Sequence, residues 1–483
     1  MLNKKLRILS TAILTVGVGL GVVSCGETST TTTGTQGTDE TKQTTEEYTT
    51  SVDTQALLDA YAEAAVTEIN AVSEEEKVLS IGCSTEDEAF ARSVIEDFKT
   101  EFPELAELVT FEFNNQVGEA DTFKAFATDA NAAPDVVLSA DDQLVNCIVA
   151  NYVNPIPEPM VNVLRQELTA SSLTAVEVKG QHYGYPAVGG NSQIVLYRKD
   201  KIDLETVDSL DDILEACKAA GKTFYFPLQE GWYISDWLWL TDGDMKIDIQ
   251  EVEDPETGEK TLKAVQTTTF TKEGLREVGD ALNGYFTKYN GTLLTTNGTN
   301  ITTLMQNDMA AGDCWGGVSW NNYNGIISAL VGAGYTEEEA QDMIGIAKIP
   351  TVTYKGEEVQ LETWDSYKVY AVNRVTKLPT LANLVAYWYT SPNSQLEHFN
   401  ARQYFPTNKE VLENETVNSS ELTRALSAIA PYTHSQAQGL TGDQVWTGLT
   451  TFGTAFGVNG TIEEEAATSA VDALFSALGG VLA

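Results

Sequence analysis

The stretch from His182 to Asp200, HYGYPAVGGNSQIVLYRKD, constrains the fold of this chain more than any other segment. It contains a Tyr-Gly-Tyr-Pro turn and a Gly-Gly-Asn-Ser loop, followed by an apolar run at residues 194–197. The glycine pair lets the backbone pass close to another surface, and the apolar run has the pattern of a strand buried on both faces. Because the first part leaves one strand and the second enters a different sheet, the stretch predicts a hinge between two lobes with a cleft in front of it.

The start of the chain has the features of a bacterial secretion signal. Lys4, Lys5 and Arg7 precede an apolar run that is too short and too rich in small residues for a spanning helix. Residues 22–25, Val-Val-Ser-Cys, resemble the lipobox of bacterial lipoproteins, which implies that Cys25 becomes an acylated N-terminus. We therefore expect a signal peptide at residues 1–24. An ordinary signal with an incidental cysteine is the alternative.

A polar segment and a short helix are expected next. Residues 25–52 are rich in Thr, Ser, Gly, Glu and Gln, and such a segment cannot bury enough apolar surface to offset its ordering entropy. It reads as a flexible tether behind the lipidated cysteine. Within residues 53–76, apolar side chains from Leu57 to Ile69 have helical spacing, which predicts an accessory helix.

Length and charge limit what the chain can be. Its 483 residues, 42% hydrophobic and 20% charged, indicate two or three globular domains. The formal net charge is −41, and it becomes −44 once the three cations of the leader are removed. Nucleic acids and anionic membrane surfaces repel such a chain, so neither is expected as its main partner. Solubility outside the cell explains the acidity.

The cysteines and histidines do not suggest a metal site. Besides Cys25, the chain has Cys83, Cys147, Cys217 and Cys314, which lack Cys-x-x-Cys spacing and have only three histidines to join them. We favour buried free thiols, although disulfide pairing outside the cytosol stays open.

The chain from residue 77 alternates strands and helices. Strands are indicated at residues 78–81, 109–113 and 134–138, and Ser84 or Thr85 can cap the helix after the first. This order implies a parallel sheet whose ligands bind at the carboxyl ends of the strands. The loops at residues 84–87 and 139–142 should therefore share one rim.

A second alternation follows the hinge. A helix at residues 210–217 ends at Gly221, and strands are indicated at residues 223–228 and 313–320. Residues 242–260 read as an acidic turn or hairpin insert, residues 351–363 as a polar connector, and residues 364–373 as a returning strand.

Catalytic and cofactor motifs are missing from the sequence. The Asp242-Gly243-Asp244 segment fails the calcium-loop pattern, no phosphate-binding glycine loop occurs, and the histidines have no nucleophile motif nearby. With 70 acidic residues, carboxylate pairs arise by chance and carry little information about a glycosidase. We expect no enzyme activity, no cofactor and no metal.

Tryptophan is more informative, because several of the eight residues stand at predicted loop edges. A pyranose stacks its apolar face on an indole while its hydroxyls bond to nearby carboxylates and amides. Core packing is the alternative, and it is favoured for Trp388 and for Trp237 or Trp239. The tryptophans expected to contact ligand are Trp232, Trp315, Trp320, Trp364 and Trp446.

Seven motifs in order resemble one family, the extracellular solute-binding proteins of ABC importers of the carbohydrate type, similar to maltodextrin-binding proteins. They are the lipobox, Pro134–Val137, His182–Pro186, Tyr197–Asp200, Leu228–Trp232, Met309–Gly312 and Phe405–Thr407. The resemblance spans about residues 77–478. It implies an α/β fold of two lobes, each a mainly parallel sheet flanked by helices, joined by hinge strands around a central cleft. The first lobe would hold residues 77–187 and 364–412, and the second residues 188–363 and 413–483.

The resemblance also implies a ligand site. The family's sugar-facing acid falls on Asp142, the acid and aromatic of its Leu-Gln-Glu segment fall on Glu230 and Trp232, and its platform tryptophans fall on Trp446 and on Trp320 or Trp315. Ser139 and Gln143 replace a tryptophan and an arginine of the maltose binder, and the loop at residues 189–191 replaces its hinge acid, so maltose itself is disfavoured. The full set of expected ligand contacts is Thr85, Glu86, Asp142, Asn191, Glu230, Trp232, Tyr233, Trp315, Trp320, Trp364 and Trp446.

The function implied is capture of a sugar or oligosaccharide by lobe closure and its delivery to ABC permease subunits. The protein would be a monomer anchored through lipid to the outer face of the cell membrane. Two alternatives stay open: the same fold binding a polyol, peptide or anion, and an extracellular enzyme acting on glycosides. Which sugar is bound does not follow from the sequence.

Overall fold

The computed structural model describes residues 51–116, 118–253, 258, 260–295, 301–439 and 443–479. They belong to one compact unit that begins at Ser51. The predicted leader, Cys25 and the predicted tether up to residue 50 lie outside the described residues. Among the helices that the structure describes, none is both long enough and apolar enough to span a bilayer.

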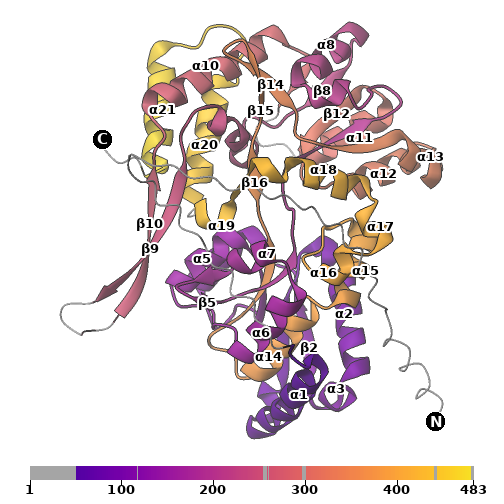
Figure 1. Cartoon of the computed structure of the whole chain (residues 1–483), viewed down its shortest axis with the longest axis vertical. Helices are drawn as coiled ribbons and strands as arrows, with labels where there is room; N and C mark the ends of the chain where they lie inside the picture. The colour runs from indigo at the N-terminus through magenta and orange to yellow at the C-terminus, as the bar shows by residue number, and fades with distance from the viewer. Residues whose placement is uncertain are drawn as a thin grey trace, which may run out of the picture. The chain divides into compact units, whose positions relative to one another are not determined.

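The first lobe is built on a five-stranded sheet in the order β2-β1-β3-β17-β6, at the bottom of Figure 1. β1 pairs in parallel with β2 and β3, as the strand–helix alternation predicts. β17 arrives from far along the chain and runs antiparallel between β3 and β6, so only one side of the sheet is parallel. The strands are β1 (Val78–Gly82), β2 (Thr110–Asn114), β3 (Val136–Ala140), β6 (Tyr185–Val188) and β17 (Lys368–Val372).

Helices cover this sheet and bury its apolar side chains. Leu79 and Ile81 of β1 are fully buried in a core that includes Val94 and Leu384 from two of these helices. The helices between residues 88 and 174 are α2 (Glu88–Glu101), α3 (Pro103–Leu108), α4 (Thr122–Thr128), α5 (Asp141–Val149), α6 (Glu158–Glu167) and α7 (Ala170–Thr174). Those after β17 are α14 (Pro379–Trp388), α15 (Pro392–Arg402) and α16 (Lys409–Leu412), whereas the next two helices, α17 (Glu415–Asn418) and α18 (Glu421–Ile429), pack against strands of the second lobe.

The segment before the first strand forms α1 (Thr54–Ala71), which is longer than the apolar spacing alone predicts. Asp53 caps it by accepting a hydrogen bond from the amide of Ala56. Ile69 is buried in the core of the first lobe, and the carboxylate of Glu68 accepts hydrogen bonds from the first turn of α14. The helix is therefore part of the first lobe's packing.

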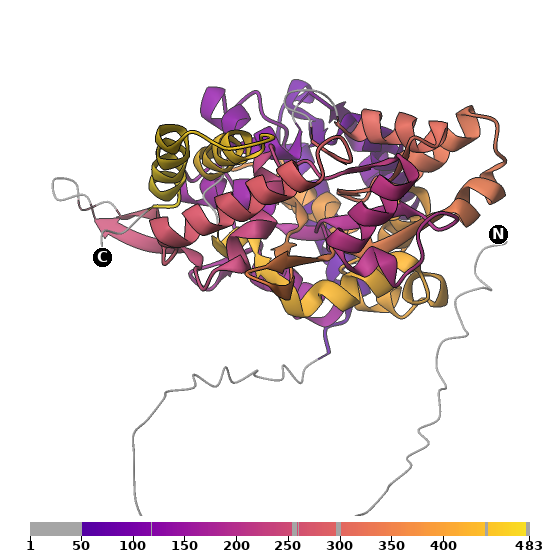
Figure 2. The same cartoon turned by 90° about the horizontal axis from the view of Figure 1, so that it is seen from above.

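The second lobe has a five-stranded sheet in the order β11-β8-β12-β7-β13. β8 pairs in parallel with β11 and β12, whereas β7 runs antiparallel between β12 and β13. The strands are β7 (Ile194–Arg198), β8 (Thr223–Tyr225), β11 (Leu293–Leu294), β12 (Cys314–Ser319) and β13 (Ile344–Lys348). Figure 2 shows from above how α10, α20 and α21 lie side by side at one end of this lobe. Its helices are α8 (Leu210–Ala220), α9 (Gly231–Ile234), α10 (Lys272–Lys288), α11 (Ile301–Ala311), α12 (Tyr323–Gly332), α13 (Glu337–Met343), α19 (Gln436–Gly439), α20 (Asp443–Phe456) and α21 (Glu464–Ala477).

Two neighbouring crossover segments connect the sheets. One runs from β6 to β7 through Gly189 and Gly190, and the other runs from β16 (Thr363–Asp365) into β17. Gly190 has a φ of 57°, which favours glycine, and a Cβ there would lie 2.6 Å from Cδ1 of Leu426 and displace that side chain. β18 (Thr433–Ser435) pairs in parallel with β16 beside them.

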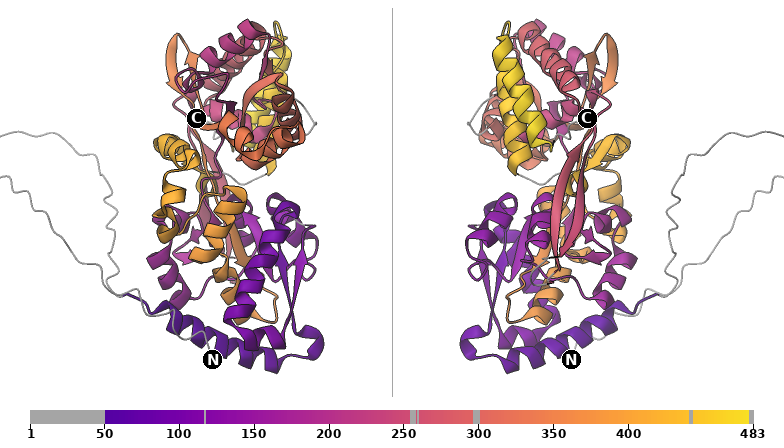
Figure 3. Two further views of the ribbon diagram at one scale, coloured as in Figure 1. Left: turned by 90° about the vertical axis from the view of Figure 1, so that its right-hand side faces the viewer. Right: turned by 90° about the vertical axis from the view of Figure 1, so that its left-hand side faces the viewer.

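The acidic insert is a long hairpin. β9 (Met245–Glu253) pairs antiparallel with β10 (Lys260–Thr268), and the hairpin extends from the second lobe alongside the first (Figures 1 and 3). Ile247, Ile249 and Leu262 on one of its faces pack against an apolar cluster of the first lobe. The hairpin therefore connects the two lobes in addition to the crossover segments.

The predicted polar connector at residues 351–363 also folds into a hairpin. β14 (Thr351–Tyr354) and β15 (Glu357–Gln360) are joined by Lys355 and Gly356, both with positive φ. Two consecutive residues of positive φ suit the tightest hairpin turns, and the sequence has a glycine at only one of them. A smaller hairpin in the first lobe joins β4 (Glu177–Val178) and β5 (Gln181–His182).

Candidate ligand site

The acidic start of α5 lies at the carboxyl end of β3, where the sequence places it. Asp141 and Asp142 are both almost fully buried. Asp141 accepts hydrogen bonds from the backbone amides of Tyr367 and Asp142, at 3.1 and 3.0 Å. Burial, followed by the charge of Asp142, raises the pKa of Asp141 well above its usual range, and burial also raises the pKa of Asp142.

Trp446, on α20 of the second lobe, contacts this acidic pair. Its Nε1 donates a hydrogen bond to Oδ2 of Asp142 at 3.1 Å, and Nε2 of Gln143 donates to the same oxygen at 3.3 Å. The indole is half-buried and packs edge-on against Trp364, with the ring centres 6.1 Å apart. Two residues that the sequence predicts for the site, from opposite ends of the chain, are thus brought together at the junction of the lobes.

Gln436 connects the pair to a second predicted tryptophan. Nε1 of Trp232 donates to Oε1 of Gln436 at 3.4 Å, and Nε2 of Gln436 donates to Oδ1 of Asp141 at 3.3 Å. Gln436 was not predicted, because it starts a four-residue helix that carries no recognisable motif. We call Asp141, Asp142, Trp232, Gln436 and Trp446 the acid–indole cluster.

The segment around Glu230 packs closely against α20. A Cβ on Gly231 would overlap the carbonyl of Trp446, which explains the glycine between Glu230 and Trp232. Glu230 is half-buried, and burial raises its pKa. Tyr233 is buried, burial raises its pKa, and its hydroxyl reaches Ser319 and the backbone of Trp320. Glu230 and Tyr233 are therefore next to the acid–indole cluster.

Trp364 lies elsewhere than expected. The sequence suggests a loop-edge indole, but the side chain is fully buried and its Nε1 donates to Oγ of Ser235 at 2.7 Å. Its ring meets Trp239 edge-on at 4.7 Å, so it belongs to the core. Trp315 and Trp320 are both half-buried, and Trp315 packs against the core of the second lobe.

The remaining predicted contacts lie at two different places. Thr85 and Glu86 are exposed in the short helix that follows β1, at the edge of the first sheet where parallel strands end. Asn191 lies in the crossover segment, where it exchanges hydrogen bonds with Ser366. The structure therefore does not bring Asn191 into the acid–indole cluster.

A network of charged side chains at the edge of the first sheet, near Thr85 and Glu86, was not predicted from the sequence. Nζ of Lys368 lies 2.8 Å from Oε1 of Glu119, and Nε of Arg402 lies 3.2 Å from Oδ1 of Asp87. Burial lowers the pKa of Lys368, but the charges of Glu119, Tyr404 and Asp87 together raise it above its usual value. These side chains come from separate segments of the chain, so no local sequence motif predicts that they meet.

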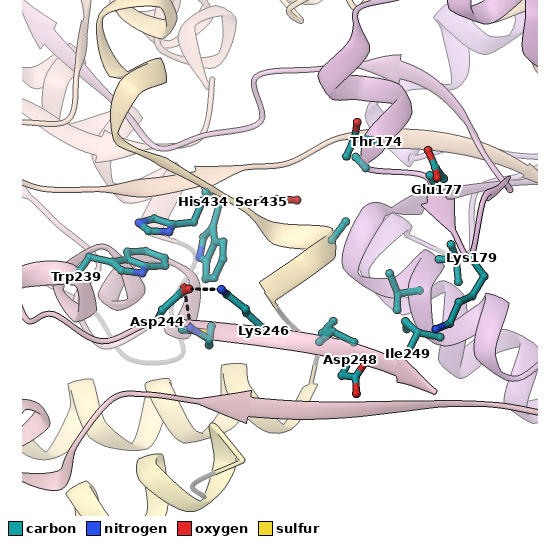
Figure 4. Close-up of a pocket in the computed structure, with 17 residues that line it drawn as sticks. Thr174, Glu177, Lys179, Trp239, Asp244, Lys246, Asp248, Ile249, His434 and Ser435 are labelled. Atoms are coloured by element: carbon teal, nitrogen blue, oxygen red, sulfur yellow. Dashed lines mark hydrogen bonds and ion pairs between the residues drawn. The ribbon is translucent and has the colours of Figure 1, made fainter. Parts of the chain in front are cut away.

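Three cavities lie around the lobe junction. One of 530 Å³ adjoins the acid–indole cluster between α5, β10 and α20. Another of 360 Å³ lies at the crossover segments. A third of 430 Å³ lies between β4 and β9, and Figure 4 shows Trp239 and His434 with their rings together on one side of it and Glu177 and Lys179 on the other. Of the predicted ligand contacts, only Trp364 borders this third cavity.

Within the described ranges, no three His, Cys, Asp or Glu side chains are arranged to hold a metal ion. Cys83, Cys147, Cys217 and Cys314 are buried free thiols, and burial raises the pKa of Cys83 to about 11.

Known structures and a known family resemble this chain. The maltodextrin-binding protein MalE1 of L. casei BL23, without ligand, is 17% identical with a TM-score of 0.61, over 83% of this chain and 98% of that one. The GacH receptor of Streptomyces glaucescens, solved unliganded and with acarbose, is 16% identical with a TM-score of 0.64, over the same shares. Maltose-bound MalE3 of T. maritima is 13% identical with a TM-score of 0.62, again over 83% and 98%.

These likenesses confirm the two-lobe fold. No curated protein matches the sequence significantly. Residues 93–425 match the family model described as bacterial extracellular solute-binding protein, which covers most of the chain and agrees with the resemblance of its motifs. The protein belongs to the bacterial extracellular solute-binding proteins.

Proposed function

We propose that this protein captures a sugar or oligosaccharide between its lobes and delivers it to an ABC importer. The observation that carries the proposal is the hydrogen bond between Trp446 and Asp142, because it places a half-exposed indole beside a carboxylate at the lobe junction. An aromatic face with polar groups at its edge is the arrangement that a pyranose needs. The similar structures bind maltose, maltotetraose or acarbose, which supports a carbohydrate ligand.

The proposed mechanism is closure of the lobes about the crossover segments, which act as the hinge. A ligand that touches both lobes only when they close stabilises the closed form by its extra contacts. The lobes would divide at residues 187–188, 363–364 and 412–413. The sugar leaves unchanged, and the permease would recognise the closed form.

Calorimetric titration of the full chain in mild detergent tests sugar capture. The panel holds mono-, di- and oligosaccharides, including maltose and maltotetraose. We expect at least one sugar to bind, and Trp446→Ala to weaken it about tenfold or more by removing the stacking face. Trp388→Phe is the control, since Trp388 packs against Phe98 and Phe102 in the first lobe. Failure of every sugar to bind, or an unchanged affinity in Trp446→Ala, would contradict the proposal.

We also propose that Cys25 anchors the mature chain to the membrane as a lipoprotein monomer. In a bacterial host fed a labelled fatty acid, the wild type should carry label and sediment with membranes. Cys25→Ser should lose both properties, whereas Cys83→Ser, which changes a buried thiol, should keep them. Label on the Cys25→Ser chain would exclude this anchor.

A further inference from the structure

We propose that the 430 Å³ cavity between β4 and β9 is a second binding site, which takes a short peptide that lies along β9 as an added strand. This inference goes beyond the proposed function, because no residue of the acid–indole cluster lines the cavity. Gln436 of that cluster stands between Ser435 and Ala437, which both line the cavity, so the segment of β18 and α19 separates the two sites. We call this space the β9 groove.

The outer edge of β9 borders the groove. Consecutive residues from Asp244 to Ile249 line it, and Figure 4 shows β9 running along it. Because successive side chains of a strand point to opposite faces, a space that meets every residue in turn lies along an edge of the strand. The other edge of β9 pairs with β10, and no other described strand pairs with β9. The amide and carbonyl groups of this open edge can therefore hydrogen-bond to an extended peptide.

The groove also has room for an apolar side chain. At one end, the rings of Trp239 and His434 are stacked with their centres 3.9 Å apart, as Figure 4 shows. Val178 of the first lobe and Ile247 of β9 line the walls. The volume of 430 Å³ falls within the range of about 300–1,000 Å³ that is typical of ligand pockets. The groove therefore suits a short peptide with an aliphatic or aromatic side chain.

Lys179 supplies a positive charge at the other end of the groove. It stands in the tight turn after β4, and no described carboxylate forms an ion pair with its Nζ. Oε2 of Glu177, on the same wall, lies 3.6 Å from Nε2 of His182 instead. An unpaired lysine beside an open strand edge can bond to the C-terminal carboxylate of a peptide laid along that edge. We therefore expect the carboxylate at Lys179 and the first residue of the peptide near Trp239.

Calorimetric titration of the full chain in mild detergent tests the proposal. The probes are the tripeptides Ala-Phe-Ala and Ala-Leu-Ala, each with a free C-terminal carboxylate or with a C-terminal amide. We expect at least one free tripeptide to bind, and its amide to bind about tenfold more weakly or worse. Lys179→Met should weaken the free tripeptide to the level of the amide and leave the amide unchanged. Lys124→Met, at an exposed lysine of α4 outside the groove, should change neither.

A second pair of variants locates the bound peptide. Thr174→Trp adds bulk to the groove from the end of α7 and should abolish tripeptide binding. The matched control is Thr128→Trp at the end of α4. Both threonines are exposed and donate a hydrogen bond to the carbonyl four residues earlier, but only Thr174 lines the groove.

Absence of binding by every tripeptide, or equal binding by the wild type and Thr174→Trp, would overturn the β9 groove as a peptide site and leave sugar capture intact. A Lys179→Met chain that still binds the free tripeptide more tightly than the amide would overturn the contact between Lys179 and the carboxylate. Loss of binding to every sugar would instead overturn the proposed function without touching the groove.

Discussion

Asn191 and Ser366 hydrogen-bond to each other in both directions across the two crossover segments. Nδ2 of Asn191 donates to Oγ of Ser366 at 2.9 Å, and that Oγ donates to the carbonyl of Asn191 at 2.8 Å. The amide of Asn191 also donates to the carbonyl of Ser366 at 3.2 Å. The side chain of Asn191 thus holds the two crossover segments together. A ligand that bonded to Asn191 would compete with these hydrogen bonds.

Removal of this bond should destabilise the fold. Ser366 is almost fully buried, so Ser366→Ala leaves the side-chain amide and the carbonyl of Asn191 without their hydroxyl partner, at a cost of about 1–3 kcal/mol. Thermal unfolding should show a lower Tm. Ser419→Ala, at an exposed serine, should change the unfolding free energy by less than about 0.5 kcal/mol. Equal Tm values for the two variants would contradict the structural role of the pair.

Replacement of Trp364 should mainly reduce the stability of the fold, whereas replacement of Trp446 should mainly reduce the affinity for sugar. Trp364→Ala opens a cavity in a fully buried position and should cost about 3–5 kcal/mol of unfolding free energy. Trp446→Ala, at a half-buried position, should cost less stability and more sugar affinity. Denaturant unfolding and calorimetric titration of both variants measure the contrast. A stable Trp364→Ala chain with weakened sugar binding would show that Trp364 contacts the ligand and would contradict its assignment to the core.

The contribution of Lys368 to the stability of the fold should be largest at neutral pH. Lys368→Met leaves Glu119 without its buried cation, a change that costs about 3 kcal/mol or more. Burial raises the pKa of Glu119, but Lys368 outweighs it and lowers that pKa below its usual value, so the carboxylate's contribution is present above the unfolded pKa and lost as the pH falls through the folded one.

The Tm deficit of Lys368→Met should therefore shrink between pH 7 and pH 3. Lys272→Met removes an exposed ion pair with Asp472 and should have little effect at any pH. A deficit for Lys368→Met that is independent of pH would mean that packing, rather than charge, explains the role of Lys368.

Asp141 predicts a pH effect of the opposite sign. Burial and the charge of Asp142 raise its pKa, so its ionised form weakens the folded state, and that cost shrinks as the pH falls below the raised folded pKa and is gone below the unfolded pKa. Asp141→Asn cannot ionise. Between pH 7 and pH 5 the Tm of the wild type should rise relative to that of Asp141→Asn. Parallel Tm curves for the two chains across this range would exclude an ionisable, energetically costly Asp141.

The strands of the two sheets and the acidic start of α5 can be predicted from the sequence alone, because these features depend on local pattern. The apolar runs of β1 and β3, the acids after β3 and the glycine loop after β6 each carry their information within a few residues. Taken in order, they predict alternating strands and helices, and the family resemblance then selects Asp142 and Trp446 as expected ligand contacts.

What lies beside those residues depends on tertiary packing. Gln436 carries no motif, and it enters the acid–indole cluster because β18 places α19 against α5. The sequence predicts Trp364 at a loop edge, but in the structure Trp239 and Ser235 pack against it. The 530 Å³ cavity between α5, β10 and α20 exists because β10 folds back onto the first lobe. Exposure and contact depend on segments far apart in the chain, and a local pattern of side chains does not encode which of them will meet.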